Sequence, residues 1–244
     1  MTIDGGVGPA PAVKLDGVGK RFGRTNALRG IDLEVWPGER LAVFGPNGSG
    51  KTTLLRILAG LTRPSKGSVR IDGLEYRNNG RSLRRRIGVV AHHPYLYEDL
   101  TAEENLQFYG RMFGLAEIQP RVDDVLRRVG MERRRRDRVR TLSRGMQQRL
   151  AIARAILHDP DLLLMDEPDT GLDQEMSARI GEFLEDERGG RRTVVLTTHN
   201  LRLGVEHCDR FMILSRGRAA YQGRNDGQDL AQLEELYRRH GAAA

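Results

Sequence analysis

The stretch that decides the fold is Gly45-Pro46-Asn47-Gly48-Ser49-Gly50-Lys51-Thr52, which fits the pattern G-x4-G-K-[ST]. It lies between a short apolar run at residues 41–44, typical of a buried strand, and a helical pattern at residues 52–59. Glycines let the backbone curl so that several N–H groups point at one phosphate, and the helix N-terminus adds a positive dipole end. The stretch therefore predicts a nucleotide phosphate site that opens an α/β domain.

Single side chains within this loop have predictable tasks. Lys51 would place a positive charge against the phosphates and so contribute to catalysis, and the Thr52 hydroxyl is a hard oxygen ligand of the kind that Mg²⁺ prefers. We expect the whole run of residues 45–53, up to and including Thr53, to bind the nucleotide. The alternative interpretation is an ordinary glycine turn with a surface lysine. The strand before the loop and the helix after it favour the phosphate site.

A pair of carboxylates follows a second apolar run, at residues 162–165. Because Mg²⁺ prefers oxygen ligands and often reaches them through water, Asp166 is expected to hold the metal ion. Glu167 would polarise the attacking water as a general base. The alternative is that the two carboxylates merely cap a following helix. A shared role for the loop and the carboxylates requires a fold that brings the two strands side by side.

Length and composition limit the classes of protein to which the chain can belong. Its 244 residues include 39% hydrophobic and 30% charged side chains, enough for one large globular domain or two small lobes sharing a core. The apolar runs are far shorter than the roughly 20 residues needed to cross a bilayer. Residues 1–12 are rich in Gly, Pro and Ala and predict a loose tail, not a secretion signal. We therefore expect a cytoplasmic protein.

The chain has a formal net charge of +7 at pH 7, and most of its basic residues are arginine. This excess is compatible with polyanions or anionic lipid head groups as partners. Arginine clusters occur at residues 84–86 and 133–136, and a solvated surface is the alternative interpretation that we favour for them. The single cysteine, Cys208, cannot form an internal disulfide and is expected to be a small buried side chain.

The periodicity of the apolar residues divides the chain into parts. Residues 13–38 alternate apolar and polar side chains, which predicts half-buried strands of a small antiparallel sheet. Between residues 101 and 155 the spacing becomes helical, beginning with a capping box of Thr101 and Glu104. Short apolar runs that predict further strands lie at residues 41–44, 68–71, 87–90, 162–165, 193–196 and 211–214, and they indicate a parallel α/β organisation. The predicted fold class is α/β, with a parallel sheet core, a small antiparallel β subdomain and a helical insert.

A third motif, Leu142-Ser143-Arg144-Gly145-Met146-Gln147-Gln148-Arg149, lies upstream of the carboxylate pair. It resembles the signature motif of the nucleotide-binding subunits of ABC transporters, and the resemblance extends over nearly the whole chain. Physically, Ser143 is a good helix N-cap, and Gly145 leaves backbone N–H groups exposed at a helix start, where an anion can bind. The resemblance implies that Ser143, Gly145 and Gln147 contact nucleotide. A simply capped helix is the alternative interpretation.

The resemblance also implies roles for single residues elsewhere. Phe22 falls where the family places an aromatic ring against adenine, Asp173 matches a loop that contacts an opposing subunit, and His199 matches a histidine that hydrogen-bonds the γ-phosphate. Taken alone, these three residues would be interpreted as a core side chain, a helix cap and a structural histidine. The family has glutamine at a metal-contacting position where this chain has His92. The resemblance thus implies a metal contact by His92, although a histidine there departs from the family pattern.

The resemblance further implies a domain layout and a mode of action. A P-loop ATPase domain of the ABC type would span residues 13–244, with a RecA-like core and its antiparallel β subdomain at 13–91 and 156–244 and a helical subdomain at 92–155. Two copies would pair head to tail, each ATP with its Mg²⁺ lying between residues 45–53 of one subunit and 143–147 of the other. ATP hydrolysis would then drive an integral membrane permease, with the protein peripheral on the inner face of the cell membrane.

The identity of the cargo and the rival functions remain open at this point. Arg144 and Met146 replace the commonest residues of the signature, as in ATPases that resemble ABC-2-type exporters, including the haem exporter of cytochrome c maturation. We expect export, with haem or another ABC-2-type cargo. The permease would dock between the insert and the His92 loop, at about residues 95–113. The alternatives are a soluble ABC ATPase acting on nucleic acid or ribosomes, although nucleic acid is not the partner we expect, and a regulator that binds ATP without cleaving it.

Overall fold

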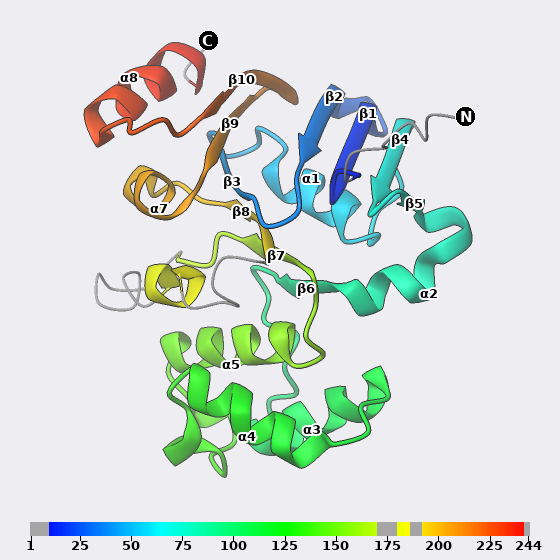
Figure 1. Cartoon of the computed structure of the whole chain (residues 1–244), viewed down its shortest axis with the longest axis vertical. Helices are drawn as coiled ribbons and strands as arrows, with labels where there is room; N and C mark the ends of the chain where they lie inside the picture. The colour runs from blue at the N-terminus through cyan, green and yellow to red at the C-terminus, as the bar shows by residue number, and fades with distance from the viewer. Residues whose placement is uncertain (1–9, 170–179, 186–191, 242–244) are drawn as a thin grey trace, which may run out of the picture.

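The computed structural model describes residues 10–169, 180–185 and 192–241, which form two β-sheets and several helices (Figure 1). A four-stranded antiparallel sheet, in the order β2-β1-β4-β5, consists of β1 (Val13–Phe22), β2 (Thr25–Val35), β4 (Lys66–Ile71) and β5 (Leu74–Glu75). A six-stranded sheet, in the order β10-β9-β3-β8-β7-β6, consists of β3 (Arg40–Phe44), β6 (Ile87–Val90), β7 (Leu162–Asp166), β8 (Thr193–Thr197), β9 (Arg210–Ser215) and β10 (Arg218–Arg224).

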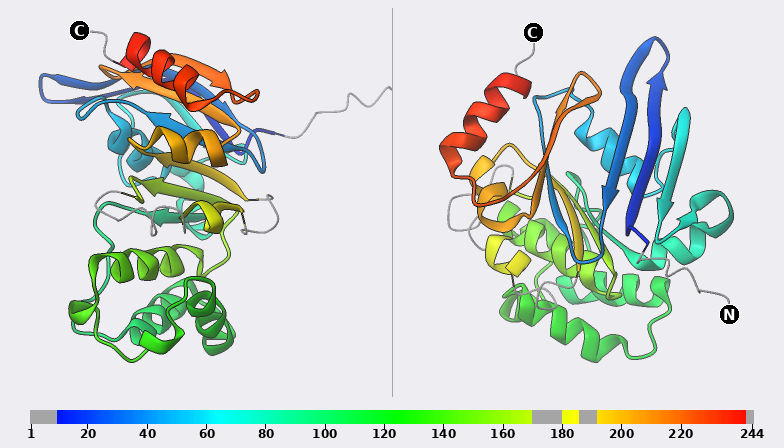
Figure 2. Two further views of the ribbon diagram at one scale, coloured as in Figure 1. Left: turned by 90° about the vertical axis from the view of Figure 1, so that its left-hand side faces the viewer. Right: turned by 45° about the horizontal axis from the view of Figure 1, so that its top comes forward.

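Helices surround the larger sheet and form a separate lobe (Figure 2). The helices are α1 (Lys51–Leu58), α2 (Tyr76–Arg86), α3 (Ala102–Phe113), α4 (Ile118–Arg128), α5 (Arg144–Ile156), α7 (Leu201–His207) and α8 (Leu230–Gly241), with short 3-10 turns at Glu132–Arg134 and Val139–Thr141. Within the described ranges, none of these helices combines the length and the apolar character needed to cross a membrane.

The larger sheet is parallel except at one edge. Strands β6, β7, β8, β3 and β9 run parallel, and every residue of β7 and β8 is buried, which explains the apolar runs at residues 162–165 and 194–196. Strand β10 pairs antiparallel with β9 and alternates exposed and half-buried residues. The apolar pattern did not predict β10 because a half-exposed edge strand has few fully apolar positions.

The parallel arrangement places three segments that are distant in sequence at one edge. Strand β8 pairs with β3 on one side and β7 on the other. The glycine-rich loop follows β3, Asp166 and Glu167 come at the end of β7, and His199 comes after β8. Because carboxyl ends of parallel strands meet at the same edge, the strand order brings the predicted site together.

Helices α3, α4 and α5 form a lobe between β6 and β7 in sequence, below the sheet in Figure 1. The predicted capping box is present: the Glu104 N–H donates to Thr101 Oγ1 at 3.2 Å, and the Thr101 N–H donates to Glu104 Oε2 at 2.8 Å. Buried apolar residues from all three helices pack together, among them Leu106, Val122 and Leu150. The described chain is thus an α/β fold with an antiparallel β subdomain and a helical insert, as predicted.

Candidate functional site

The glycine-rich loop has a backbone path that side chains would block. Gly45 and Gly50 have φ angles of 156° and 112°. A Cβ atom at Gly45 would lie 2.2 Å from the carbonyl oxygen of Leu214, and one at Gly50 would lie 2.6 Å from that of Ala27. Helix α1 then begins without a side-chain cap, so the N–H groups of its first turn have no intrahelical partner. The loop and the helix start together offer several backbone donors to a phosphate.

Lys51 lies beneath this loop and is 5% exposed. Its Nζ donates to the carbonyl oxygen of Gly45 at 2.7 Å and lies 3.4 Å from Glu167 Oε1. Burial lowers the pKa of Lys51, while the nearby Glu167 carboxylate acts in the opposite direction. The ammonium group is therefore held close to the point where the phosphates of a nucleotide would meet the loop.

The three residues with predicted catalytic roles meet at the ends of α1, β7 and β8. Glu167 Oε1 lies 2.8 Å from Nε2 of His199, which in turn lies 3.4 Å from Lys51 Nζ. Glu167 has a φ angle of 49°, and its N–H donates to the carbonyl oxygen of Thr197 at 3.0 Å. This backbone bond to β8 helps to hold Glu167 in a left-handed conformation that is uncommon for residues other than glycine.

The predicted metal-binding residues also lie together. Thr52 Oγ1 donates to Asp166 Oδ1 at 3.2 Å, and a cavity of about 80 Å³ is lined in part by Thr52, His92 and Asp166. Among the described residues, no group of three or more His, Cys, Asp or Glu side chains could hold a metal ion by itself. The hydroxyl and carboxylate oxygens fit Mg²⁺, whose remaining ligands would be phosphate and water oxygens.

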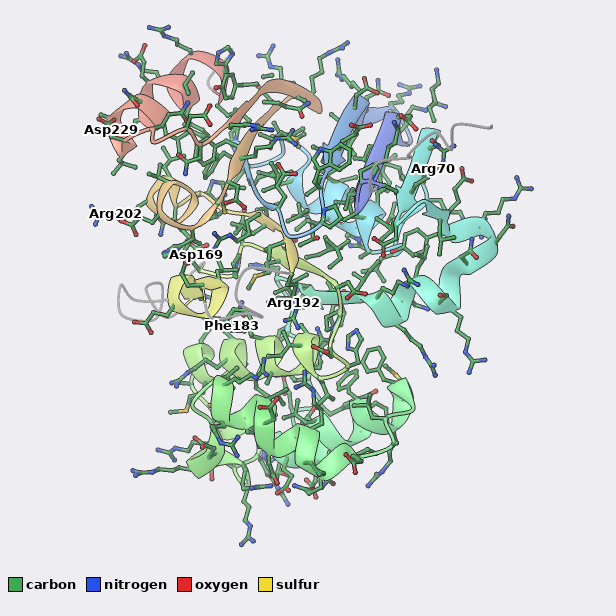
Figure 3. The ribbon with its side chains drawn as sticks, in the orientation of Figure 1. Arg70, Asp169, Phe183, Arg192, Arg202 and Asp229 are labelled. Atoms are coloured by element: carbon green, nitrogen blue, oxygen red, sulfur yellow. The ribbon has the colours of Figure 1, made fainter. Side chains whose placement is uncertain are left out.

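Two threonines and one aspartate of the site were missed by the sequence analysis. Thr197 Oγ1 donates to Asp166 Oδ1 at 2.8 Å, and Thr198 Oγ1 donates to Asp169 Oδ1 at 2.9 Å. Both threonines are fully buried, and Asp169 lies beside the end of the sheet in Figure 3. The sequence signal that could have revealed them is the pair of adjacent threonines, Thr197 and Thr198, that directly follows the apolar run at residues 194–196. They orient the carboxylates of the neighbouring segment.

The start of the signature helix has the predicted geometry. Ser143 is the N-cap of α5, and its Oγ accepts from the N–H of Met146 at 3.3 Å. The Gln147 amide, which was expected to contact nucleotide, donates to two backbone carbonyls at 3.2 Å each. Gln148 Nε2 donates to the carbonyl oxygen of Pro168 at 3.0 Å and so ties α5 to the segment after Glu167. Gly145 lies in the first turn of α5.

The two remaining predicted residues are on the periphery of the site. Phe22 ends β1 with 52% of its surface exposed, and Lys20 Nζ lies 4.8 Å from its ring centre. An exposed ring at this place is available for stacking against a planar base. Asp173, the predicted contact with an opposing subunit, lies outside the residues that the structure describes.

The fold and the gathered residues define a phosphate-loop ATPase with an inserted helical lobe. The family model of ABC transporters matches residues 28–170. Over 221 residues the chain is 38% identical to the Nod factor export ATP-binding protein I of Ralstonia nicotianae, covering 90% of this chain and 69% of the relative. Over 214 residues it is 38% identical to the ABC transporter ATP-binding protein NatA of Bacillus subtilis, covering 86% of this chain and 84% of the relative.

Solved structures agree with the sequence relatives. The dimeric structure of a post-hydrolysis state of an ATP-binding cassette, bound to ADP and Pi, matches with a TM-score of 0.80 at 31% identity, covering 88% of this chain and 100% of that chain. The chain therefore belongs to the ABC transporter family, and it is an ATP-binding subunit with ATP hydrolase activity. The predicted ABC-type fold class is confirmed.

Proposed function

We propose that this protein is the ATPase subunit of an export system and that it works as a head-to-tail dimer on a separate membrane permease. The observation that carries the proposal is the meeting of Lys51, Glu167 and His199 beside the phosphate loop. Export is inferred because the Ralstonia relative is named for export of Nod factor. The predicted subdomains, at residues 13–91 with 156–244 and at 92–155, are retained as part of this proposal.

The proposed division of labour follows from charge and geometry. Lys51 would neutralise charge on the phosphoryl oxygens, and Glu167 would orient the attacking water and accept its proton. His199 would hydrogen-bond the γ-phosphate, with its ring held by the 2.8 Å contact to Glu167. Thr52, Asp166 and His92 would hold Mg²⁺, which when bound would neutralise further phosphate charge. Phe22 would stack against the adenine ring.

Dimerisation is proposed because the ATP site has two halves. Within one chain, the phosphate loop belongs to the sheet and the Ser143 N-cap belongs to the helical lobe. A second copy would present its Ser143, Gly145 and Gln147 to the ATP held by the first. Support comes from the related cassette, whose structure is described as dimeric. ATP would hold the pair closed, and hydrolysis would release it.

The permease is proposed to dock in a groove between the sheet and the helical lobe. A cavity of about 340 Å³ is lined there by side chains that include Leu61, Tyr95, Met112 and Phe113. Leu61, Tyr95 and Met112 are 54%, 51% and 59% exposed and line the same groove, and exposed apolar side chains that gather in one place mark interaction sites. A short amphipathic cytoplasmic segment of the permease would cover these side chains and would transmit the closing of the dimer. The protein would then sit at the inner face of the membrane.

The test uses the Glu167→Gln variant. We expect it to bind ATP, to lose turnover, and to elute as a dimer in size-exclusion chromatography with ATP and Mg²⁺. The matched control is Glu117→Gln, an exposed position before α4 with no side-chain cap contact, which should behave as the wild type. A variant that stays monomeric with saturating ATP would contradict the proposed dimer, and full turnover would contradict the role of Glu167.

The transported cargo and the alternative function need separate tests. A haem cargo, suggested by Arg144 and Met146, stays a prediction, since the relatives reported above are not named for haem. A soluble ATPase acting on nucleic acid or ribosomes remains the alternative. Stimulation of ATP turnover by the permease in proteoliposomes, with no response to RNA or DNA, would separate the transporter from that alternative.

A further inference from the structure

Helix α2 has a row of arginines that the core of the protein does not need. Its eleven residues include no acidic side chain, and Leu83 is the single buried residue of the helix. The arginines, all exposed, are Arg77, Arg81, Arg84, Arg85 and Arg86. They are called the α2 arginines below. In Figure 3, side chains tipped with nitrogen extend from α2 away from the body of the molecule.

The positive charge of this helix is poorly compensated inside the protein. Within the part of the chain that the structure describes, only Arg86 among the α2 arginines forms an ion pair, with Asp72 at 3.1 Å. Beyond the kink at Asn79, Arg81 and Arg85 are one helical turn apart and repel each other. A helix that keeps like charges at neighbouring positions is destabilised by them, so a counter-charge from outside the chain would stabilise it.

The position of α2 indicates where that counter-charge lies. Arg84 lines the same groove as Leu61 and Met112, the exposed apolar side chains at which the permease is proposed to dock. Helix α2 projects sideways from the sheet next to β6, on the side where the groove is lined by α3 (Figure 1). Clusters of basic residues at the cytoplasmic side of a membrane protein are typical of surfaces that bind anionic lipid head groups.

We propose that the α2 arginines bind the anionic phospholipid head groups of the inner membrane leaflet. The orientation of this surface toward the membrane rests on the proposed docking of the permease in the groove. Head-group phosphates would supply the missing negative charge beside the groove, whose apolar side chains the permease segment would cover. Nucleic acid would also supply phosphates, but the proposed docking of a membrane permease in the adjoining groove places the α2 arginines beside the bilayer and favours lipid.

The experiment measures binding of the full-length protein, without permease, to vesicles. Vesicles of phosphatidylglycerol are compared with vesicles of phosphatidylcholine by co-sedimentation at low and at physiological salt. The test variant is Arg77→Gln/Arg81→Gln/Arg85→Gln, which leaves the groove residue Arg84 intact. The control, Arg133→Gln/Arg136→Gln/Arg138→Gln, removes the same charge from exposed positions on the helical lobe. ATP turnover in solution, which involves neither set, checks that both variants are folded.

We expect the wild type to bind the anionic vesicles, to ignore the zwitterionic ones, and to dissociate as salt is raised. One arginine near such a surface contributes about a fivefold factor in binding, so the test variant should lose roughly a hundredfold. The control should keep nearly all of its binding. An equal loss in both variants, or a wild type that ignores phosphatidylglycerol, would overturn the proposal.

Two further outcomes separate the lipid proposal from nucleic-acid binding and from the proposed ATP-dependent dimer. If the α2 variant bound vesicles normally but lost affinity for a labelled RNA or DNA duplex, the arginines would be a nucleic-acid surface and the lipid proposal would be wrong. ATP-dependent dimerisation of Glu167→Gln is measured in solution without lipid, so its failure would contradict the proposed dimer and leave the vesicle result standing.

Discussion

Replacing Thr197 with valine tests whether the hydroxyl at the end of β8 positions the Asp166 carboxylate, which we propose binds Mg²⁺. Valine has nearly the same shape, and Thr197 is fully buried, so the change removes the hydroxyl without opening a cavity. Thr197 Oγ1 donates to Asp166 Oδ1 at 2.8 Å and accepts from the Glu167 N–H at 3.1 Å. That N–H keeps its bond to the Thr197 carbonyl oxygen at 3.0 Å, so the principal loss is the bond to Asp166.

The expected magnitude follows from the charge of the acceptor. A hydrogen bond to a charged group contributes about 1.5–3 kcal/mol, so the free energy of unfolding should fall by about that amount. Removing a group that orients a metal ligand typically lowers metal affinity or activity by roughly 10–100-fold. The Mg²⁺ concentration for half-maximal ATP turnover should therefore rise by about tenfold or more. Chemical denaturation and a Mg²⁺ titration of ATPase activity measure the two effects.

The matched control lies on the same strand. Thr193 Oγ1 accepts from the Gly38 N–H at 3.0 Å, at the opposite end of β8 from the site, and Thr193 is also buried. Thr193→Val should lower stability by about 1 kcal/mol and leave the Mg²⁺ dependence unchanged. If Thr197→Val and Thr193→Val had the same Mg²⁺ dependence as the wild type, the positioning role of Thr197 would be refuted.

Two other substitutions test the phosphate loop, at Gly50, and the groove, which His158 lines. Gly50→Ala should abolish nucleotide binding and lower the free energy of unfolding by about 2–3 kcal/mol, because the new Cβ would meet the Ala27 carbonyl oxygen at a φ of 112°. The control is Gly73→Ala, which also has a positive φ but lies in open space. It should cost about 1 kcal/mol and keep ATP binding, as measured by calorimetry. Burial lowers the pKa of His158 to about 4, so the unfolded state takes up its proton first as the pH falls below about 6.5. Between pH 6.5 and 4 the free energy of unfolding of the wild type should fall by up to about 3 kcal/mol more than that of His158→Gln. Chemical denaturation at each pH measures this difference, and the same pH dependence in both proteins would contradict the prediction.

Much of the site could be predicted because a phosphate site needs glycines, backbone N–H groups and charged side chains at set positions along the chain. A loop such as 45–52 needs glycine at set positions, and the Cβ clashes at Gly45 and Gly50 give the physical reason. Asp166 and Glu167 could be predicted because carboxylates rarely follow a fully buried strand without a task. Thr197 could not, since threonine is also a common strand residue, and its hydroxyl becomes informative only when β7 is known to lie beside β8.

The arginine-rich helix escaped prediction for a different reason, which bears on its proposed role. Amphipathic helices are predicted from apolar side chains that recur every third or fourth residue, and α2 has a single buried residue, Leu83. The same lack of buried apolar surface means that little of the folding free energy depends on α2. Changes at Arg77, Arg81 and Arg85 are therefore expected to leave the core intact, since these side chains are exposed and without ion pairs in the described part of the chain. A surface of this kind can be altered without loss of the ATPase, so vesicle binding and ATP turnover can be measured as independent properties.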